Sequence, residues 1–439
     1  MNNQRTNSFK SQRQKSKGIS LPLFIRKSGI YQFLTKLKRG QKTNLRLDLK
    51  GLQPLKLKRI PTLLILGFFL FFGGFHVVKY FSFIPESYDG SEIKSSLGRN
   101  SSILIVGFND RVEGYRFPEY ISVVNINNSA NLTRIYGINP SFSIRQINTQ
   151  LALKNLWNNL DSEEKMPEFI SRLESFLGLK LDGYIVFDRS IALEFLSNEN
   201  FSMQTSLEYS NEGKTIQKNQ LLNASEIFNF MFDINVANND LVKFQNEFTK
   251  AFLDSFKNPF KIYNTIFNSS EFLKTYKTNF DRGTLIKLIS FFNQAQIIVP
   301  EKGFLSTDLG TKDNDRDLYV PNMTIMDDSI RSFFSDFEVV KEQAKVEVFN
   351  ATNTAGIANR YRRMIQNKGG NVINVNNFPE LIDEIKIYLD LGNYDSLSNT
   401  IDLISSSMGV DVTILSIDEY KYNYSGDIIL VIGSDILLE

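Results

Sequence analysis

The chain has 439 residues, of which 42% are hydrophobic and 22% charged, so most of it can bury a core and wholesale disorder is excluded. The formal net charge of +2 conceals an uneven distribution along the chain. Residues 1–59 hold 16 Lys and Arg and a single acid, Asp48, whereas the remaining 380 residues hold 34 basic and 47 acidic side chains. A basic N-terminal tail therefore precedes an acidic remainder.

An uncharged apolar run over residues 60–78 separates these two parts. As a helix that rises about 1.5 Å per residue, the run spans about 28 Å, which is close to the hydrocarbon thickness of a bilayer. We therefore expect a transmembrane helix over residues 60–81. The basic residues before it predict a cytoplasmic tail over residues 1–59 and place the chain from about residue 82 onward outside the cell membrane. A cleaved signal peptide is the alternative, but no small-x-small cleavage site precedes Pro85.

The basic tail has two interpretations. Clustered Lys and Arg without acids are typical of nucleic-acid binding. Next to a membrane span, however, such residues fix topology and bind anionic lipid head groups, at about 1 kcal/mol each. We favour membrane lipid as the partner of this tail and expect no nucleic acid.

Several kinds of catalytic site are excluded by composition. The chain has no cysteine, which rules out disulfides, thiolate metal sites and cysteine nucleophiles. Its one histidine, His76, lies near the end of the apolar run, so Ser-His-Asp triads and multi-histidine zinc sites are excluded as well. Catalysis would have to use carboxylates, Arg, Lys or hydroxyl groups.

From residue 100 the pattern is that of a mixed α/β domain. Short apolar runs predict strands at residues 102–107, 120–126, 132–138 and 181–187. Helical periodicity predicts helices at residues 147–160, 169–177 and 191–196 and over most of 225–298, with Gly178 closing the second of these. Such alternation indicates a central sheet covered by helices.

An ordered series of segments carries a family resemblance. The segments are 103–107 with Arg111, 124–127, 146–148, 177–187, 221–228 and 277–288. Together they resemble the extracytoplasmic domain of the LytR-CpsA-Psr (LCP) family, and the resemblance implies a divergent α/β LCP-like sandwich domain over residues 95–300. Members of that family are understood to transfer glycopolymers from a polyprenyl-pyrophosphate carrier to the cell wall, with Arg on the pyrophosphate and acids on Mg²⁺ and the acceptor hydroxyl.

The charged positions of the family pattern are only partly kept. The Gly-x-Asp-x-Arg element retains Arg111 but has Asn109 at the acid, with Asp110 beside it. The next Arg-x-Asp element has Glu119 at the acid and Arg116 one position away from the arginine, and the later Pro-Arg-Asp element is the uncharged 139–141. Losing such cations leaves a diphosphate undercompensated.

The resemblance implies a set of site residues at the matching positions. It assigns Arg111, Asp110 and Glu119 to catalysis. It assigns ligand binding to Asn109, Arg116, Asn148, Asp240 and Lys243. No metal ligand and no cofactor is assigned, although an active site of this kind would use Mg²⁺. Each of these residues taken alone also fits an ordinary solvated surface group.

The last part of the chain has a second α/β pattern. Residues 301–342 read as a linker, and strands at 344–350, 371–375, 385–389 and 426–435 with helices at 357–367 and 394–408 predict a small domain over residues 343–439. The segments 346–359 and 427–435 resemble the LytR C-terminal domain, which implies an accessory or wall-binding role. The absence of a Gly-x-Gly-x-x-Gly motif argues against nucleotide binding.

Two classes of function follow. The first expectation is a membrane-anchored LCP-like protein of cell-envelope glycopolymer assembly, with an impaired pyrophosphate site and an envelope-binding or accessory role. The alternative is an active phosphotransferase that moves a glycopolymer from polyprenyl pyrophosphate to the cell wall. Polyprenyl-linked glycopolymer and cell wall are the expected partners. A transcriptional regulator is disfavoured because the domain is expected outside the membrane.

Overall fold

The computed structural model describes residues 97–146, 149–160, 165–211, 214–233, 238–258, 275–301 and 303–437. The expected transmembrane helix over residues 60–81 and the basic tail lie outside these residues. Within the ranges given, no helix is both long enough and apolar enough to cross a bilayer.

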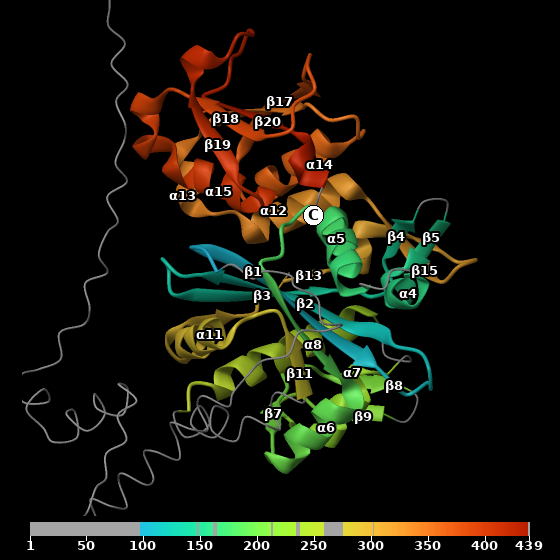
Figure 1. Cartoon of the computed structure of the whole chain (residues 1–439). Helices are drawn as coiled ribbons and strands as arrows, with labels where there is room; N and C mark the ends of the chain where they lie inside the picture. Colours follow the sequence, from blue (N-terminus) through green and yellow to red (C-terminus); the bar gives the residue numbers. More distant parts are fainter. Residues whose placement is uncertain are drawn as a thin grey trace, which may run out of the picture. The chain divides into compact units, whose positions relative to one another are not determined.

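A seven-stranded mixed sheet forms the centre of the first part (Figure 1), in the order β11-β6-β1-β2-β3-β12 with β13 also paired to β3. Its strands are β1 (Asn100–Asn109), β2 (Phe117–Asn127), β3 (Leu132–Ile138), β6 (Gly183–Asp188), β11 (Tyr276–Thr278), β12 (Gln296–Ile298) and β13 (Phe304–Leu305). Strands β1 and β6 are parallel, whereas β1 and β2 are antiparallel. The carboxyl ends of β1 and β6 therefore lie at the same edge of the sheet.

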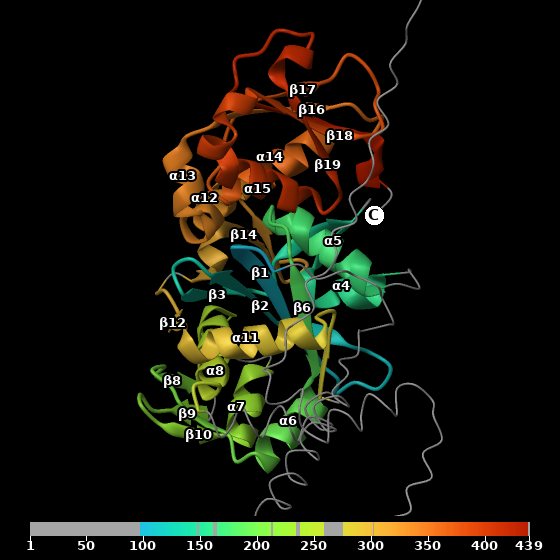
Figure 2. The ribbon, with the colours of Figure 1, turned by 60° about the vertical axis from the view of Figure 1, so that its left-hand side comes forward.

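Helices cover both faces of this sheet. Side chains that alternate along the strands, such as Leu104 and Val106, pack with α4 (Leu153–Leu156), α5 (Lys165–Leu177) and α12 (Met323–Phe334). The side chains at the intervening positions, such as Ile103 and Ile105, lie on the other face and pack with α6 (Arg189–Asn198), α7 (Ala224–Met231), α8 (Asn238–Ser255) and α11 (Arg282–Gln294). Figure 2 shows α11 and α8 next to the sheet on this second face. Because both faces are covered, β1 is apolar almost without interruption.

Smaller elements connect these layers. They are β4 (Ser143–Gln146), β5 (Thr149–Ala152), η4 (Trp157–Asn159), β7 (Ser202–Gln204), β8 (Tyr209–Asn211), β9 (Lys214–Ile216), β10 (Leu221–Asn223), η5 (Thr307–Leu309), β14 (Gly310–Asp313), β15 (Leu318–Pro321) and α13 (Phe337–Glu342).

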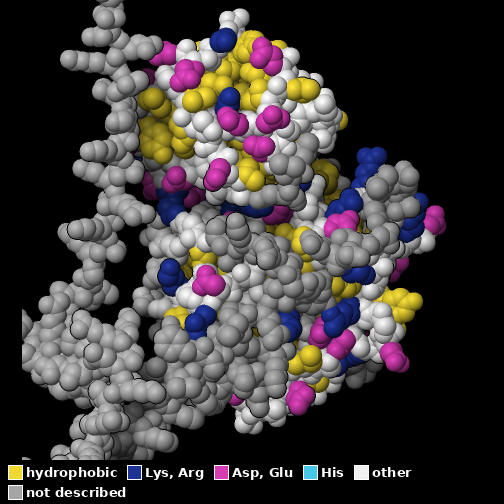
Figure 3. All heavy atoms as spheres, in the orientation of Figure 1, with side chains coloured by type: hydrophobic (Ala, Val, Ile, Leu, Met, Phe, Trp, Pro, Cys, Tyr) yellow, Lys and Arg dark blue, Asp and Glu magenta, His cyan; other side chains and the backbone are white. Residues whose placement is uncertain are grey.

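The C-terminal part contains its own five-stranded sheet in the order β17-β16-β20-β18-β19. The strands are β16 (Lys345–Asn350), β17 (Asn371–Asn377), β18 (Ile385–Leu389), β19 (Val412–Ser416) and β20 (Ile428–Ile432). Helices α14 (Ile357–Asn367) and α15 (Ser398–Met408) pack on one face, and the short helices η6 (Leu391–Asn393), η7 (Asp395–Leu397), η8 (Ile417–Glu419) and η9 (Ser434–Leu437) complete it. Hydrophobic side chains show on its surface among charged ones of both signs in Figure 3.

Helix α14 packs against the end of α5. Arg363 forms an ion pair with Asp327 at 2.7 Å and donates to the backbone carbonyls of Ser175 (2.6 Å) and Phe176 (3.0 Å). Asn367 donates to the carbonyl of Gly178, which has a φ of +61° and closes α5 as the sequence predicted. The last carbonyls of α5, which have no partner inside their own helix, are thus satisfied by α14.

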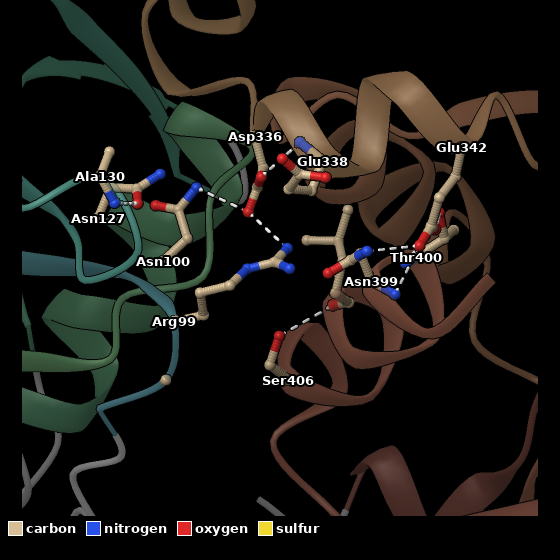
Figure 4. A network of polar contacts seen from close by, with 12 residues as sticks. Arg99, Asn100, Asn127, Ala130, Asp336, Glu338, Glu342, Asn399, Thr400 and Ser406 are labelled. Carbon is tan, nitrogen blue, oxygen red and sulfur yellow. Dashed lines mark hydrogen bonds and ion pairs between the residues drawn. The ribbon is translucent and has the colours of Figure 1, made fainter. Parts of the chain in front are cut away.

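A second polar network lies near the amino end of β1. Asp336 accepts from Arg99 at 2.8 Å and from Asn100 at 3.4 Å, and Figure 4 shows these contacts together with Glu342 beside Asn399 and Thr400. Glu342 accepts from the backbone N–H of both Asn399 and Thr400 at 2.8 Å, so it caps a helix that has no cap of its own. The segment 336–342 is thereby joined to the start of β1 and to the first turn of α15.

Four stretches differ from the prediction. Residues 147–160 were expected to be one helix, but their described part forms β5, α4 and η4. The helical stretch 225–298 also contains the three-residue strands β11 and β12, and β19 was not predicted at all. Where the sequence indicated a linker at 301–342, α12 buries Ile330 and Phe333 in the core below the first sheet. Strands of three residues are too short to show a period, and the apolar positions of α12 lie among polar ones.

Candidate functional site

Charged side chains converge where β1 and β6 end. Asn109 is the last residue of β1, and Asp110 and Arg111 follow it; Asp188 is the last residue of β6, and Arg189 opens α6. Glu119 and Arg116 belong to the neighbouring strand and the turn before it. These seven residues are called the strand-end cluster here. Ligands of α/β sheets commonly bind outside the carboxyl ends of parallel strands, which is where the cluster lies.

A β-bulge places Glu119 in this cluster. Gly107 pairs with Tyr120 and Phe108 pairs with Pro118, so Glu119 is an extra residue on β2. A bulge breaks the strict alternation of side chains along a strand, so a side chain can lie on the face that regular alternation would not give it. Glu119 consequently reaches Asn109, whose buried side-chain amide donates to Glu119 Oε2 at 2.8 Å.

The acidic groups of the cluster are held by neighbours. Asp110 accepts from the backbone N–H of Ser190 at 3.3 Å and from the Ser190 hydroxyl, and so is bound to the first turn of α6. Asp188 forms an ion pair with Arg116 at 3.2 Å. Among the described residues, Asp188 Oδ1 is buried without a hydrogen-bond partner.

Two guanidinium groups, those of Arg111 and Arg189, interact electrostatically with Glu119. Arg111 is exposed and makes one long hydrogen bond, 3.5 Å from Nη1 to the carbonyl of Phe232. Arg189 donates through Nη2 to Asn229 Oδ1 at 3.1 Å, and its buried Nε has no partner in the described part of the chain. Burial lowers the pKa of Arg189 and the charge of Arg111 lowers it further, whereas the charges of Asp110 and Glu119 act in the opposite direction.

The acids respond to burial and to these cations. Burial raises the pKa of Glu119, and the hydrogen bond from Asn109 and the charges of Lys154, Arg111 and Arg189 act in the opposite direction. Burial also raises the pKa of Asp188, against the charge of Arg116, while the nearby Asp110 adds to the increase. Carboxyl groups with raised pKa values beside cations are typical of functional sites.

An apolar cavity lies on the face of the sheet that α6, α7, α8 and α11 cover, and sequence neighbours of the cluster residues line it. It has a volume of about 60 Å³ and is lined almost entirely by carbon atoms. Phe187 and Ala192, which flank Arg189 in the sequence, both line it, as does Tyr120, which follows Glu119. Helices α8 and α11 close it through Phe252 and Ile289 among others.

The structure brings most of the predicted site residues together. Asn109, Asp110, Arg111, Arg116 and Glu119 all belong to the strand-end cluster. Asp240 and Lys243 instead pair with each other at 3.7 Å at the start of α8, where Lys243 lies 5.7 Å from the ring centre of Phe304. No hydrogen bond or ion pair of the described residues joins them to the cluster, and Asn148 lies outside those residues.

Asp188 and Arg189 were not predicted as site residues. The strand at 181–187 was predicted, and its parallel partner β1 ends at Asn109. Charged residues directly after the strand at 181–187 are therefore expected at the same edge of the sheet as Asn109. The family resemblance instead assigned a site acid to Asp240 on α8. Gln245 on that helix does reach the cluster, where its buried Nε2 donates to the Glu119 carbonyl at 3.0 Å.

A Mg²⁺ ion would need free carboxylate oxygens in the strand-end cluster. The three carboxylates of the cluster are each engaged by a donor, and within the described ranges no group of three or more His, Asp or Glu side chains could hold a metal ion. The residues present do not form a built metal site.

Comparisons with known proteins give structural likenesses. Neither a protein-family model nor a curated protein sequence matches the chain. The chain is similar to TagV of B. subtilis, with 12% identity and a TM-score of 0.43 over 54% of this chain and 97% of that one. It is similar to TagU of B. subtilis (15% identity, TM-score 0.39, 53% and 94% covered) and to TagT bound to LI-WTA (12%, 0.41, 56% and 96%). These neighbours are LCP proteins, the family that the sequence resembles.

Proposed function

We propose that the chain binds the phosphate head group of a polyprenyl-linked lipid and acts in the assembly of cell-envelope glycopolymers. In this proposal an LCP-like domain over residues 95–300 and a C-terminal domain over 343–439 stand outside the cell membrane on a single anchor, with the basic tail on anionic lipid in the cytoplasm. The proposal rests on the residues of this chain and on the resemblance of their sequence.

One observation carries the proposal: residues that line the apolar cavity lie within a few positions in the sequence of the cationic residues of the strand-end cluster. A polyprenyl phosphate is itself an anionic head on a hydrocarbon chain. Arg111 and Arg189 supply charge-assisted donors for the phosphate oxygens, and the unpartnered Nε of Arg189 is a buried donor that such an oxygen would satisfy. The apolar cavity behind them suits the hydrocarbon.

The cavity must widen for a long chain to enter. Its volume of about 60 Å³ equals the liquid volume of about two water molecules. Phe252 is only partly buried, so this lining residue of α8 can move outward with less loss of buried apolar area than a fully buried one such as Phe248. Apolar burial of the lipid, at about 25 cal/mol per Å², would offset the cost of that movement.

The charge balance of the cluster favours weak head-group binding and therefore an accessory role. Three arginines stand beside three carboxylates, and Arg116 is already paired with Asp188. Lys154 and Lys277 add positive charge within range of Glu119 and Asp188. The surplus is small for a diphosphate, because a buried anion is costly unless it is fully paired.

Phosphotransfer to a wall acceptor is a second candidate, which the raised pKa of Glu119 favours. A carboxylate with raised basicity beside two cations can accept the proton of an attacking hydroxyl while the phosphate is held by Arg111 and Arg189. The new bond joins the acceptor oxygen to phosphorus, and the lipid phosphate departs with the electron pair of the broken bond.

A titration with farnesyl pyrophosphate tests the binding proposal on the full-length chain. Arg111→Ala and Arg189→Ala should each weaken binding about tenfold or more, since charge-assisted contacts contribute about 1.5–3 kcal/mol. Arg145→Ala, an exposed arginine on β4, is the matched control and should leave binding unchanged. Equal affinities for all four proteins would contradict the assignment.

A further inference from the structure

A second cavity lies in the C-terminal part, where β16 and β17 end and α14 begins. It has a volume of about 210 Å³ and is lined by Asn350, Gly356, Ala358, Asn359, Val375, Asn376 and Asn377. This cavity is called the amide pocket. Asn350 ends β16 and Asn377 ends β17, and the two strands are parallel. The carboxyl end of parallel strands is the usual place for a ligand in an open α/β sheet.

The lining of the amide pocket is polar but uncharged. It carries four asparagine amides and no Lys, Arg, Asp or Glu. Each amide presents both donors and an acceptor, which matches hydroxyl and acetamido groups, since these also donate and accept. An ionised ligand would find no opposite charge on the lining, and leaving a charge unpaired is costly.

Part of the pocket is held rigidly before any ligand arrives. Asn350 is 8% exposed, and its Oδ1 accepts from the N–H of Thr352 at 2.9 Å and the hydroxyl of Thr352 at 2.8 Å. Its Nδ2 donates to the carbonyl of Thr354 at 3.0 Å. The loop between β16 and α14 is thereby fixed around the cavity.

Other amides remain available. Asn376 donates to Asn374 at 2.9 Å, and the exposed side chain of Asn377 makes no hydrogen bond with any described residue. Gly356 has a φ of +86° and nothing within 4 Å of where a Cβ would stand, so open space reaches the backbone there. The pocket thus combines a fixed wall with free amide groups.

We infer that the amide pocket binds one residue of a neutral carbohydrate. The volume equals that of about seven waters and is below the range of about 300–1,000 Å³ usual for drug-sized ligands. It therefore suits a single sugar ring whose neighbours lie along the surface. The inference is independent of the strand-end cluster, because the two sites share no residue.

Titration of the full-length chain with two neutral trisaccharides, maltotriose and tri-N-acetylchitotriose, tests the inference. We expect at least one to bind with a dissociation constant on the order of 1 mM, typical of a few neutral hydrogen bonds. The double variant Asn376→Ala/Asn377→Ala should weaken that binding about tenfold. Asn371→Ala, exposed at the opposite end of β17, is the matched control.

The replaced side chains are exposed, so the thermal unfolding midpoint should not change in any variant. An unchanged midpoint verifies that each variant is folded. Inorganic phosphate is titrated in parallel. Binding of neither sugar at about 10 mM would overturn the inference. So would sugar binding that the double variant leaves intact, or phosphate binding that the double variant abolishes while the sugars do not bind. Loss of farnesyl pyrophosphate binding in the arginine variants would not affect any of these outcomes.

Discussion

The side-chain amide of Asn109 donates a 2.8 Å hydrogen bond to Glu119, an extra residue that a bulge inserts into the neighbouring strand. At the position of Asn109 the family pattern has an acid. The amide adds no negative charge beside Glu119, and it orients that carboxylate by a hydrogen bond that an ionised acid could not donate.

This geometry predicts how head-group binding changes with pH. Burial raises the pKa of Glu119, so this carboxyl takes up a proton at higher pH than an ordinary glutamic acid. Protonation removes a negative charge beside the arginines, and affinity for farnesyl pyrophosphate should rise as pH falls through that pKa. Glu119→Gln should bind more tightly at neutral pH and lose this part of the pH dependence. Parallel titrations across pH measure both, and identical profiles would rule out Glu119 as a neighbour of the bound anion.

If the apolar cavity holds the lipid chain, a substitution there should weaken lipid binding without weakening head-group binding. Ala192→Phe places a ring in the cavity beside Phe187 and should weaken binding of farnesyl pyrophosphate about tenfold, because the hydrocarbon loses its space. Inorganic pyrophosphate has no chain, so its binding should not change. Overpacking costs about 1–3 kcal/mol, which thermal unfolding will register. Equal losses for both ligands would mean that the cavity does not receive the lipid.

The contact between α14 and α5 predicts a stability effect. Arg363→Ala removes the ion pair with Asp327 and leaves two carbonyls at the end of α5 without donors, which should lower the free energy of unfolding by about 2–3 kcal/mol. Arg362 lies on the same helix and, among the described residues, bonds Gln366 and the exposed Asn359 of that helix, so Arg362→Ala should cost less than about 1 kcal/mol. Urea unfolding measures the free energy of unfolding of both variants. If Arg363→Ala lowers it no more than Arg362→Ala does, the contacts of α14 with α5 contribute little to stability.

The charge asymmetry of the sequence predicts topology. Proteinase added to intact cells without a wall should digest the chain beyond residue 82 and spare residues 1–59, because basic residues stay on the cytoplasmic side. Antibodies against each part follow the fragments. Protection of the C-terminal half in intact cells, with digestion only after lysis, would contradict the anchor and its orientation.

The sequence predicted the long elements well for physical reasons. Helix α14 occupies residues 357–367 as expected, because its buried positions follow a clear helical period, and α5 ends where Gly178 takes a left-handed conformation. Strands β11 and β12 were missed because three residues cannot show alternation. They form strands because β11 pairs with β6 and β12 pairs with β3, and both partners lie far away in the sequence.

The candidate site was predictable in part. Asn109, Asp110, Arg111 and Glu119 follow strands that the sequence shows plainly. The bulge that turns Glu119 toward Asn109 has no local signal, and Arg189 joins the cluster only because β6 lies parallel to β1. Asp240 and Lys243 pair with each other instead, since the side chain of this helix that reaches the cluster is Gln245.

The most direct test of the lipid-phosphate site is a crystal structure of the chain with farnesyl pyrophosphate. We expect the hydrocarbon between the sheet and helices α8 and α11, with phosphate oxygens on Arg111 and on Nε of Arg189. An ordered ligand elsewhere on the chain, or an unchanged cavity at saturating ligand, would contradict the account.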